Sequence, residues 1–361
     1  MKILLCFSQS DKFICSYDYI HMNCPEDQSV QQFLADIEKN YFSELKIVQV
    51  NFESGNESLF SHQQPLYPCS KAQVYILIKY DLKTISEISK ELISRESENQ
   101  EIVFEPMINQ SKFLEKTELI VDEISKGRIY QVNLTSAMSG TTSLTAEQIF
   151  YKFESLFKGD YKALLPSPQF SIISFSPELF LQQIDGELLT RPIKGSLPGN
   201  RNFSEKLIDN KKEEAELSMI VDLMRNDLNS LSDQESAVVS AHRQQMQLDY
   251  IQHTFSEIKV KCEKPLSEVL KKTFPGGSIS GCPKRESLKI ISELEPFRRQ
   301  AYTGALGWWQ KNQFGLNVTI RSFIKAEDQI FYHAGCGIVY DSLPESEWQE
   351  FLLKAGTLNV K

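Results

Sequence analysis

The order of strand-like and helix-like segments is the feature that most constrains what this chain can fold into. Short apolar and β-branched runs cluster over residues 161–189 and recur at residues 47–52 and 74–79, as is typical of strands. A doubly wound sheet or a β/α barrel needs a helix after each strand, and the chain lacks this strict alternation. The pattern therefore predicts an α+β fold.

Helical spacing of apolar residues marks segments between these runs. The predicted helices cover residues 30–41, 85–94, 111–127 with Ser111 as the cap, 204–228, 283–294 and 344–355. A strand is expected over residues 128–136, and the proline- and glycine-rich residues 190–203 are expected to form a loop that presents side chains to ligands. The charged, amide-rich residues 95–110 are the predicted boundary between an amino-terminal region, 1–108, and the remainder, 109–361.

Composition limits the classes of partner. The 361 residues are 41% hydrophobic and 24% charged, so a sizeable core can form. Lys plus Arg number 39 against 48 Asp plus Glu, and this net charge of −9 argues against non-specific nucleic-acid binding. No segment approaches the ~20 apolar residues of a membrane-spanning helix, so we expect a cytoplasmic protein without membrane contact. The seven cysteines form no C-x-x-C pair, which favours reduced thiols.

Two glycine-rich segments lack residues that a nucleotide site needs. Gly276 and Gly281 have the outer spacing of a phosphate-binding loop, but Cys282 and Pro283 stand where a lysine and a magnesium-binding hydroxyl are required. Residues 335–340 match only part of a dinucleotide fingerprint. We therefore expect neither class of nucleotide site.

Two of the predicted helices carry glutamates three residues apart. Glu213 and Glu216 form one such pair, and Glu347 and Glu350 form the other. This spacing directs both side chains of a pair to nearly the same side of a helix. Oxygen ligands from two helices, without His or Cys, suit Mg²⁺. Spacing alone leaves open the alternative that these glutamates are solvated surface charges.

Three single residues have a functional and a structural interpretation. Lys194 stands between a proline and a glycine, His253 lies in a β-type run, and Arg321 follows a predicted strand. The lysine could be exposed on a loop, the histidine could be a core residue with a backbone partner, and the arginine could form a structural ion pair rather than bind a carboxylate. Local sequence does not decide between these interpretations.

A series of strings in a fixed order resembles the chorismate-utilising enzyme family. The strings are residues 127–134 (GRIYQVNL), 176–179 (SPEL), 192–196 (PIKGS), 213–227 (EEAELSMIVDLMRND), 275–284 (PGGSISGCPK), 320–322 (IRS) and 334–350 (AGCGIVYDSLPESEWQE). The resemblance implies a four-layer α/β/β/α sandwich of two packed, mainly antiparallel sheets with the active site between them. Residues 109–361 would form the chorismate-binding catalytic region, and residues 1–108 a shortened amino-terminal region packed into the same fold.

The resemblance also implies a ligand set. Glu216 and Glu350 would hold Mg²⁺ beside the ring carboxylate of chorismate, with Glu213 and Glu347 supporting them. The substrate would be bound by Tyr302 and Arg321 at its enolpyruvyl carboxylate, by the backbone of Gly335, Gly337 and Ile338 at its ring carboxylate, and by Gln131, Gly195 and Ser196.

Two positions distinguish branches of the family. Relatives that add water to the ring carry a lysine where this chain has Gln131, and a glutamine amide cannot accept a proton at neutral pH. With Lys194 in this loop, the chain resembles the branch that aminates chorismate at C4 through a covalent lysine intermediate. In that branch Glu178 would be the general acid, with a raised pKa, and His253 would lie nearby. That resemblance implies ammonia from a separate glutamine amidotransferase subunit. The alternatives are an anthranilate-forming enzyme and a catalytically silent chorismate-binding subunit.

Overall fold

The computed structural model describes residues 2–7, 12–90, 100–157, 159–198, 211–232, 235–247, 251–354 and 358–360. The helices are α1 (Val30–Asn40), α2 (Ile85–Lys90), α3 (Gln110–Ser125), α4 (Ala146–Glu154), α5 (Lys211–Asn229), α6 (Leu266–Thr273), α7 (Gly277–Ser280), α8 (Lys284–Leu294) and α9 (Pro344–Lys354). The strands are β1 (Ile3–Phe7), β2 (Lys12–Asn23), β3 (Lys46–Val50), β4 (Ala72–Thr84), β5 (Val103–Pro106), β6 (Gln131–Thr141), β7 (Tyr161–Pro166), β8 (Ser171–Ser176), β9 (Leu179–Ile184), β10 (Glu187–Arg191), β11 (Ile193–Pro198), β12 (Val238–Gln247), β13 (Ile251–Lys261), β14 (Gly281–Cys282), β15 (Ala305–Gln310), β16 (Gln313–Val318), β17 (Ser322–Ala326), β18 (Gln329–Ile338) and β19 (Asn359–Val360).

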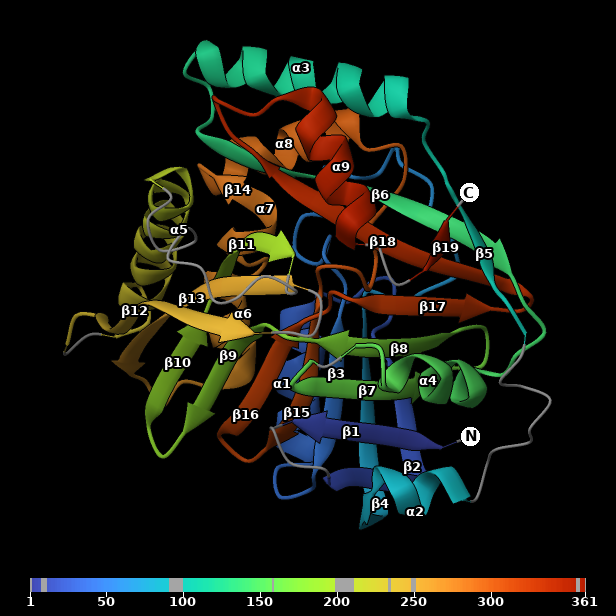
Figure 1. Cartoon of the computed structure of the whole chain (residues 1–361). Helices are drawn as coiled ribbons and strands as arrows, with labels where there is room; N and C mark the ends of the chain where they lie inside the picture. The colour runs from blue at the N-terminus through green and yellow to red at the C-terminus, as the bar shows by residue number, and fades with distance from the viewer. Residues whose placement is uncertain are drawn as a thin grey trace.

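The strands form one hydrogen-bonded ladder that folds back on itself (Figure 1). Neighbouring strands follow in the order β14, β6, β18, β17, β8, β7, β1, β2, β4, β3, β15, β16, β9, β10, β13 and β12, all antiparallel. β11 also pairs with β13, and β5 pairs with β6. The long pair β2–β4 joins the two halves, because β1 bonds to β2 whereas β3 bonds to β4.

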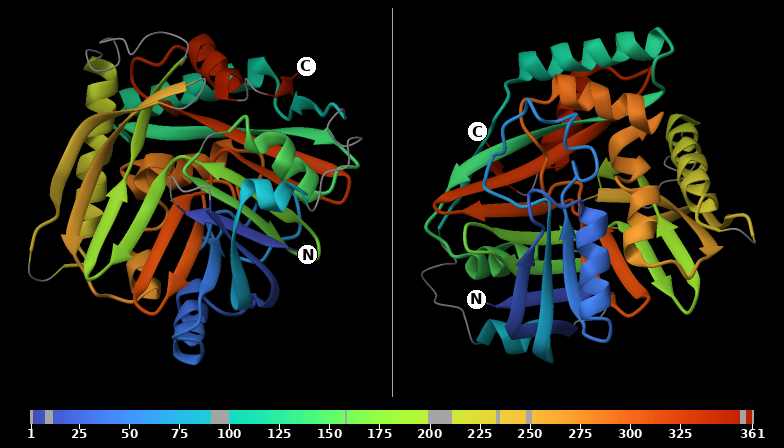
Figure 2. Two further views of the ribbon diagram at one scale, coloured as in Figure 1. Left: turned by 60° about the horizontal axis from the view of Figure 1, so that its bottom comes forward. Right: turned by 180° about the vertical axis from the view of Figure 1, so that it is seen from behind.

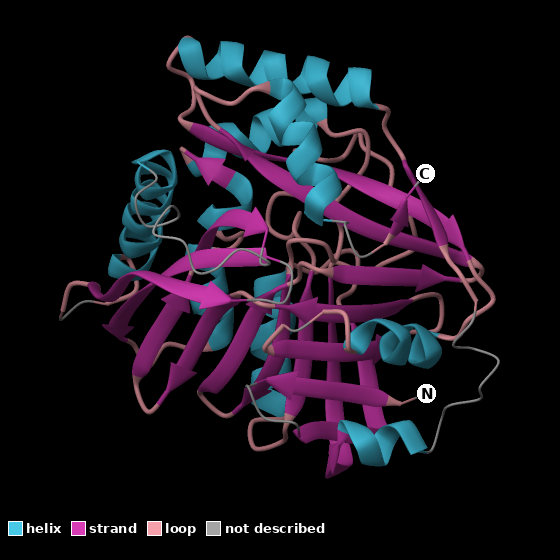
Figure 3. Cartoon of the chain, in the orientation of Figure 1, coloured by secondary structure: helices cyan, strands magenta, loops and turns pink. Residues whose placement is uncertain are grey.

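Both faces of the folded ladder are buried. Leu5 of β1, Leu165 of β7 and Leu306 of β15 belong to a core between the halves. Outside, Phe150 of α4 and Phe33 of α1 belong to a larger core that covers the other faces. Figures 1 and 3 show α4 and α9 in front of the strands, and the right-hand view of Figure 2, seen from behind, shows α1 and α6 on the opposite side. The predicted α+β sandwich is confirmed, with the difference that its two packed sheets are parts of one continuous hydrogen-bonded series of strands.

Two further predictions concern cysteines and membranes. All seven cysteines lie among the described residues and none of them is disulfide-bonded, as predicted. Within the described ranges, no helix combines the length and the apolar character that a membrane crossing requires.

The predicted loop at residues 190–203 is wrong in its described part. Residues 193–198 form β11, and residues 199–203 lie outside the described residues. The partner of this strand is β13, in which Phe255 faces Ile193 and Thr254 faces Lys194, while Pro192 precedes the paired residues. Proline and glycine therefore mark the strand's start and a register shift, and the distant partner is not visible in the local sequence.

Other boundaries differ by a few residues. Asn109, not Ser111, caps α3, because its side chain accepts a hydrogen bond from the backbone of Lys112 at 3.0 Å. The strand predicted at residues 128–136 starts at Gln131 and ends at Thr141, since β14 pairs with Gln131 and β18 pairs with residues 132–141. The predicted start of the helix at 204–228 and the predicted end of the helix at 85–94 lie outside the described residues.

A buried ion pair joins the amino-terminal region to β6 and α7. The guanidinium of Arg299 contacts the carboxylate of Glu295 at 2.6 and 2.8 Å, and both side chains are 1% exposed. The same guanidinium donates to the backbone oxygens of Ile279 at 2.8 Å and Asn133 at 2.5 Å, and it lies 4.4 Å from the ring centre of Phe52. One side chain therefore crosslinks three segments that are distant in sequence.

Arg299→Met is expected to lower the free energy of unfolding by about 3–5 kcal/mol, because it leaves the Glu295 carboxylate buried without its cation. Urea denaturation at neutral pH measures the change. Arg128→Met is the control, since Arg128 pairs with Glu123 at 2.9 Å but is 35% exposed, and such pairs contribute about 1 kcal/mol or less. Equal losses in the two variants would contradict a special role for the buried pair.

Candidate functional site

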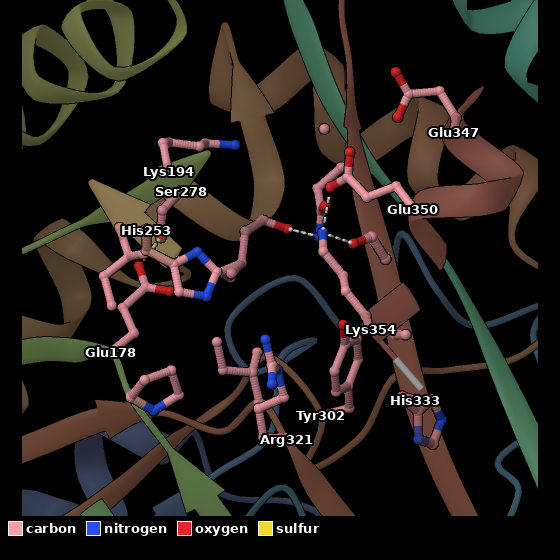
Figure 4. Close-up of a pocket in the computed structure, with 18 of the residues that line it drawn as sticks. Glu178, Lys194, His253, Ser278, Tyr302, Arg321, His333, Glu347, Glu350 and Lys354 are labelled. Carbon is pink, nitrogen blue, oxygen red and sulfur yellow. Dashed lines mark hydrogen bonds and ion pairs between the residues drawn. The ribbon is translucent and has the colours of Figure 1, made fainter. Parts of the chain in front are cut away.

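A cavity lies between β18 and α9 on one side and β11 and β13 on the other (Figure 4). Figure 4 shows Glu178, Lys194 and His253 on one side, and Glu347, Glu350 and Lys354 on the other, with Tyr302 and Arg321 below them. The lining also includes Glu216 of α5 and Ser278 of α7. The cavity thus collects side chains from both halves of the ladder.

Glu178 is a buried carboxyl group held by hydrogen bonds. Its backbone N–H donates to Oγ of Ser176 at 3.2 Å, and its carbonyl accepts from the N–H of Val318 at 3.1 Å. Its Oε1 accepts a bond from Oγ of Ser278 at 2.7 Å. Burial raises the pKa of Glu178 from 4.5 to about 7, although Ser278 and the charge of Lys194 act in the opposite direction. A carboxyl group with this pKa can donate or accept a proton near neutral pH.

Lys194 reaches the cavity from β11. Its carbonyl accepts a hydrogen bond from Oγ1 of Thr254 at 3.1 Å, which fixes the backbone beside β13. A Cβ added to Gly337 would lie 3.0 Å from the Lys194 amine and 2.7 Å from the Gln131 side-chain nitrogen. Glycine at position 337 therefore leaves the space in which these two groups lie. Gln131 is 1% exposed, and its Oε1 has no hydrogen-bond partner among the described residues.

His253 lies one residue before Thr254 on β13 and is buried. It lines the cavity, and Figure 4 shows its imidazole on the same side as Glu178 and Lys194. The structure thus places the three residues with predicted catalytic roles around one cavity.

The glutamates of α9 lie close to a thiol and a lysine. Ligand atoms of Cys336, Glu347 and Glu350 all lie within 4.8 Å of one another. Oε1 of Glu347 accepts a bond from Ser342 at 2.7 Å. The amine of Lys354 lies 2.8 Å from Glu350. These carboxylate oxygens fit a hard cation such as Mg²⁺.

The other helix contributes a further carboxylate. Glu216 of α5 is buried and lines the same cavity as Glu350. The side chain of Glu213, predicted to support it, lies outside the described residues. The described part of the predicted ligand set, Glu216, Glu347 and Glu350, therefore comes from two helices.

Tyr302 and Arg321 line the part of the cavity that is drawn at the bottom of Figure 4. Burial raises the pKa of Tyr302 to about 12, so its phenol remains a hydrogen-bond donor at neutral pH. Arg321 has a φ of +52°, an uncommon conformation for a non-glycine residue, and its carbonyl accepts a bond from the N–H of Phe175 at 3.1 Å. This bond to β8 anchors the turn from which its side chain enters the cavity.

The remaining residues predicted to bind substrate are described mainly through their backbone positions. Gly335 and Gly337 line the cavity, and Ile338 packs into the core while its backbone pairs with β6. Gly195 and Ser196 belong to β11, and the side chain of Ser196 is not among those described.

Several residues that line the cavity were not predicted from the sequence, among them Ser278, Lys354 and His333. Ser278 lies inside the quoted string 275–284, and Lys354 follows Glu350 by one helical turn, so a spacing argument could have found both. His333 has no local signal. It stacks on Tyr302 with ring centres 5.0 Å apart, and burial together with the charge of Arg299 lowers its pKa to about 3, so its imidazole is neutral.

Glu178→Gln is expected to gain stability relative to the natural chain as pH rises. The folded-state pKa of about 7 lies above 4.5, so the contribution of the protonated carboxyl is complete below 4.5 and is lost as pH rises through about 7. Urea denaturation at about pH 5 and about pH 8 measures this difference. Glu118→Gln, on the exposed face of α3, is the control, and a pH-independent difference for Glu178→Gln would contradict the raised pKa.

Comparison with known proteins agrees with this geometry. A family model described as chorismate binding enzyme matches residues 14–359. Aminodeoxychorismate synthase component 1 of Bacillus subtilis is 34% identical over 261 residues, which cover 70% of this chain and 56% of that protein. An anthranilate synthase component 1 of Haloarcula marismortui is 32% identical over 278 residues, which cover 74% and 55%. The chain thus spans about half the length of the curated relatives it matches.

Solved structures share the fold. Anthranilate synthase component I of Streptococcus pneumoniae superposes with a TM-score of 0.83 at 21% identity, covering 99% of this chain and 92% of that one. The menaquinone-specific isochorismate synthase of Escherichia coli superposes with a TM-score of 0.75 at 19% identity, covering 99% and 87%. With its motifs, fold and sequence match in agreement, the chain belongs to the family of chorismate-binding enzymes.

Proposed function

We propose that the chain is an aminodeoxychorismate synthase component I, which converts chorismate and ammonia into 4-amino-4-deoxychorismate and leaves the enolpyruvyl group in place. The observation that carries the proposal is the pairing of Lys194 with Glu178 on one side of a cavity whose other side carries carboxylates. A nucleophilic amine and a protonated acid are the two groups that a covalent allylic substitution needs.

The first step forms a bond to Lys194. Its unprotonated amine attacks C2 of the ring, the ring double bond shifts, and the C4–oxygen bond breaks. Glu178 donates its proton to the departing oxygen, which leaves as water. The raised pKa of Glu178, about 7, keeps a useful fraction of the acid protonated near neutral pH.

The second step reverses the first with a different nucleophile. Ammonia attacks C4, the double bond shifts back, and the C2–nitrogen bond to Lys194 breaks, so that the lysine is regenerated as an amine. The Glu178 carboxylate regains a proton as the new C4 ammonium group loses one. Gln131 has no basic group at the position from which water would be activated, which favours ammonia over water.

Positive groups and a metal would bind the substrate's two carboxylates. Arg321 and the protonated phenol of Tyr302 lie in the same part of the cavity and suit the enolpyruvyl carboxylate. Glu216 and Glu350 would hold Mg²⁺, with Glu347 and Glu213 supporting them, and the ion would supply positive charge for the ring carboxylate. His253 would lie against the reacting face.

The nitrogen source would be a separate glutamine amidotransferase subunit. Ammonium dominates over ammonia at neutral pH, so a direct supply of ammonia from glutamine raises the rate of the second step. Relatives are named component 1 of aminodeoxychorismate synthase, a name that implies a second component, and we assign the release of ammonia from glutamine to that component.

Anthranilate synthase component I is the second candidate, because relatives with that name match at 30–32% identity, against 34% for the Bacillus subtilis aminodeoxychorismate synthase component 1. It would eliminate pyruvate and form an aromatic ring. Lys194 favours the first proposal, since anthranilate synthases resemble this loop but carry a small residue at that position.

Chorismate, Mg²⁺ and an ammonium salt at mildly alkaline pH are expected to give an amino-substituted chorismate, seen by mass spectrometry, without release of pyruvate. Lys194→Ala should lower turnover by at least about 100-fold with folding unchanged, partly restored by high ammonia. Glutamine should replace ammonium only when the amidotransferase subunit is added. Anthranilate with equimolar pyruvate would establish the second candidate, and unchanged chorismate under every condition would indicate a silent binding subunit.

Gly337→Ala is expected to fold but to lose about 100-fold in turnover, because a small displacement of a reacting group has an effect of that size. The added methyl group would meet the ends of two flexible side chains, Gln131 and Lys194, which can move aside. Thermal unfolding and steady-state kinetics measure the two effects. Full activity in this variant would remove the Lys194 amine from the reacting position.

A further inference from the structure

We propose that Cys336, Glu347 and Glu350 form a mixed thiolate–carboxylate site for a thiophilic divalent cation such as Co²⁺, Zn²⁺ or Cd²⁺. The inference concerns which ions can bind between β18 and α9, beside the cavity that Glu347 and Glu350 line, and it stands whether or not the substrate is chorismate. It adds a sulfur ligand to a place where the sequence pattern indicates oxygen ligands alone.

The geometry brings three ligand atoms of two kinds together. Sγ of Cys336 and a carboxylate oxygen from each glutamate lie within 4.8 Å of one another, and in the described part of the chain this is the one such cluster of three. Cys336 lies on β18 and is fully buried, whereas the glutamates lie one turn apart on α9. Strand and helix thus hold the ligands from opposite sides.

The thiol already faces α9. Its Sγ lies 3.3 Å from the backbone oxygen of Glu347 and donates a hydrogen bond to it. A cation that binds sulfur replaces the thiol proton, so one proton is released and this hydrogen bond is lost. The new metal–sulfur bond compensates for that loss only when the cation is soft enough to prefer sulfur.

This requirement separates the ions. Mg²⁺ takes oxygen ligands and gains nothing from a thiol. Zn²⁺ binds thiolate sulfur and carboxylate oxygen together, and Co²⁺ and Cd²⁺ accept similar sets. The sulfur therefore strengthens binding of thiophilic ions selectively, and those ions would compete with Mg²⁺ for Glu350.

Charged groups beside the cluster enter this competition, and Lys194 acts on Cys336 through its charge. Lys354 lies 2.8 Å from Glu350 and donates to the backbone oxygen of Gly335 at 2.5 Å. An incoming cation must share Glu350 with this ammonium or displace it. Since the lysine opposes all divalent ions alike, the preference among them depends on Cys336.

Titration of the purified full-length chain with Co²⁺, followed by absorption spectroscopy, tests the proposal without an activity assay. The natural chain should show a near-ultraviolet thiolate-to-Co²⁺ charge-transfer band at one equivalent, and excess Mg²⁺ should not remove it. Cys336→Ala should lose the band and bind Co²⁺ about 10- to 100-fold more weakly, since even loss of a residue that supports a metal ligand has this effect. Glu350→Gln should weaken binding of both Co²⁺ and Mg²⁺.

Cys69→Ala is the matched control, because Cys69 is a partly buried thiol that lines a different cavity; it should leave the band unchanged. Cys336→Ser provides a second variant if the alanine variant is unstable, and circular dichroism checks the folding of each. A Co²⁺ complex without the band, or a band that persists in both Cys336 variants, would overturn the proposal. A failed chorismate assay with an intact band would refute only the proposed reaction.

Discussion

The buried pair of Arg299 and Glu295 is the interaction on which the cavity depends. Its guanidinium supplies bonds to the backbone of Asn133 and Ile279, and its carboxylate accepts the N–H of Thr135 at 2.9 Å. Asn133 and Ile279 line the cavity. An ion pair in a protein interior is stable only when further hydrogen bonds satisfy both partners, and here those bonds hold the wall of the site.

The same cavity contains two carboxyl groups, Glu178 and Glu350, in different surroundings. Glu178 is buried, which favours its neutral form although Ser278 and Lys194 oppose the effect, whereas Glu350 lies beside the ammonium of Lys354. The two carboxyl groups of one cavity therefore have different electrostatic surroundings. The division agrees with an acid on the reacting side and an anionic ligand set on the other.

Local patterns predicted most helices, because each buries an apolar stripe that repeats every three or four residues. They could not predict β11, since the strand exists only through pairing with β13, some 60 residues away along the chain. In the site, too, local patterns indicated the residues that share one helix but not those brought in by contacts between distant segments. Glu347 and Glu350 share a helix and a visible spacing, whereas His333 enters the cavity through stacking on Tyr302, a contact between distant segments. The sequence strings that resemble the family provided the expected roles of the glutamates, Lys194, His253 and Arg321, which local patterns alone left open.

The ladder order has a consequence for synthesis of the chain. β1, β2, β4 and β3 lie between β7 and β15, so β3 pairs with a strand about 250 residues later. Closing such a large loop is entropically unfavourable until many contacts form together. The outer edge groups of β3 must therefore stay unpaired until nearly the whole polypeptide has been made. During that interval they are the surfaces most open to association with other chains.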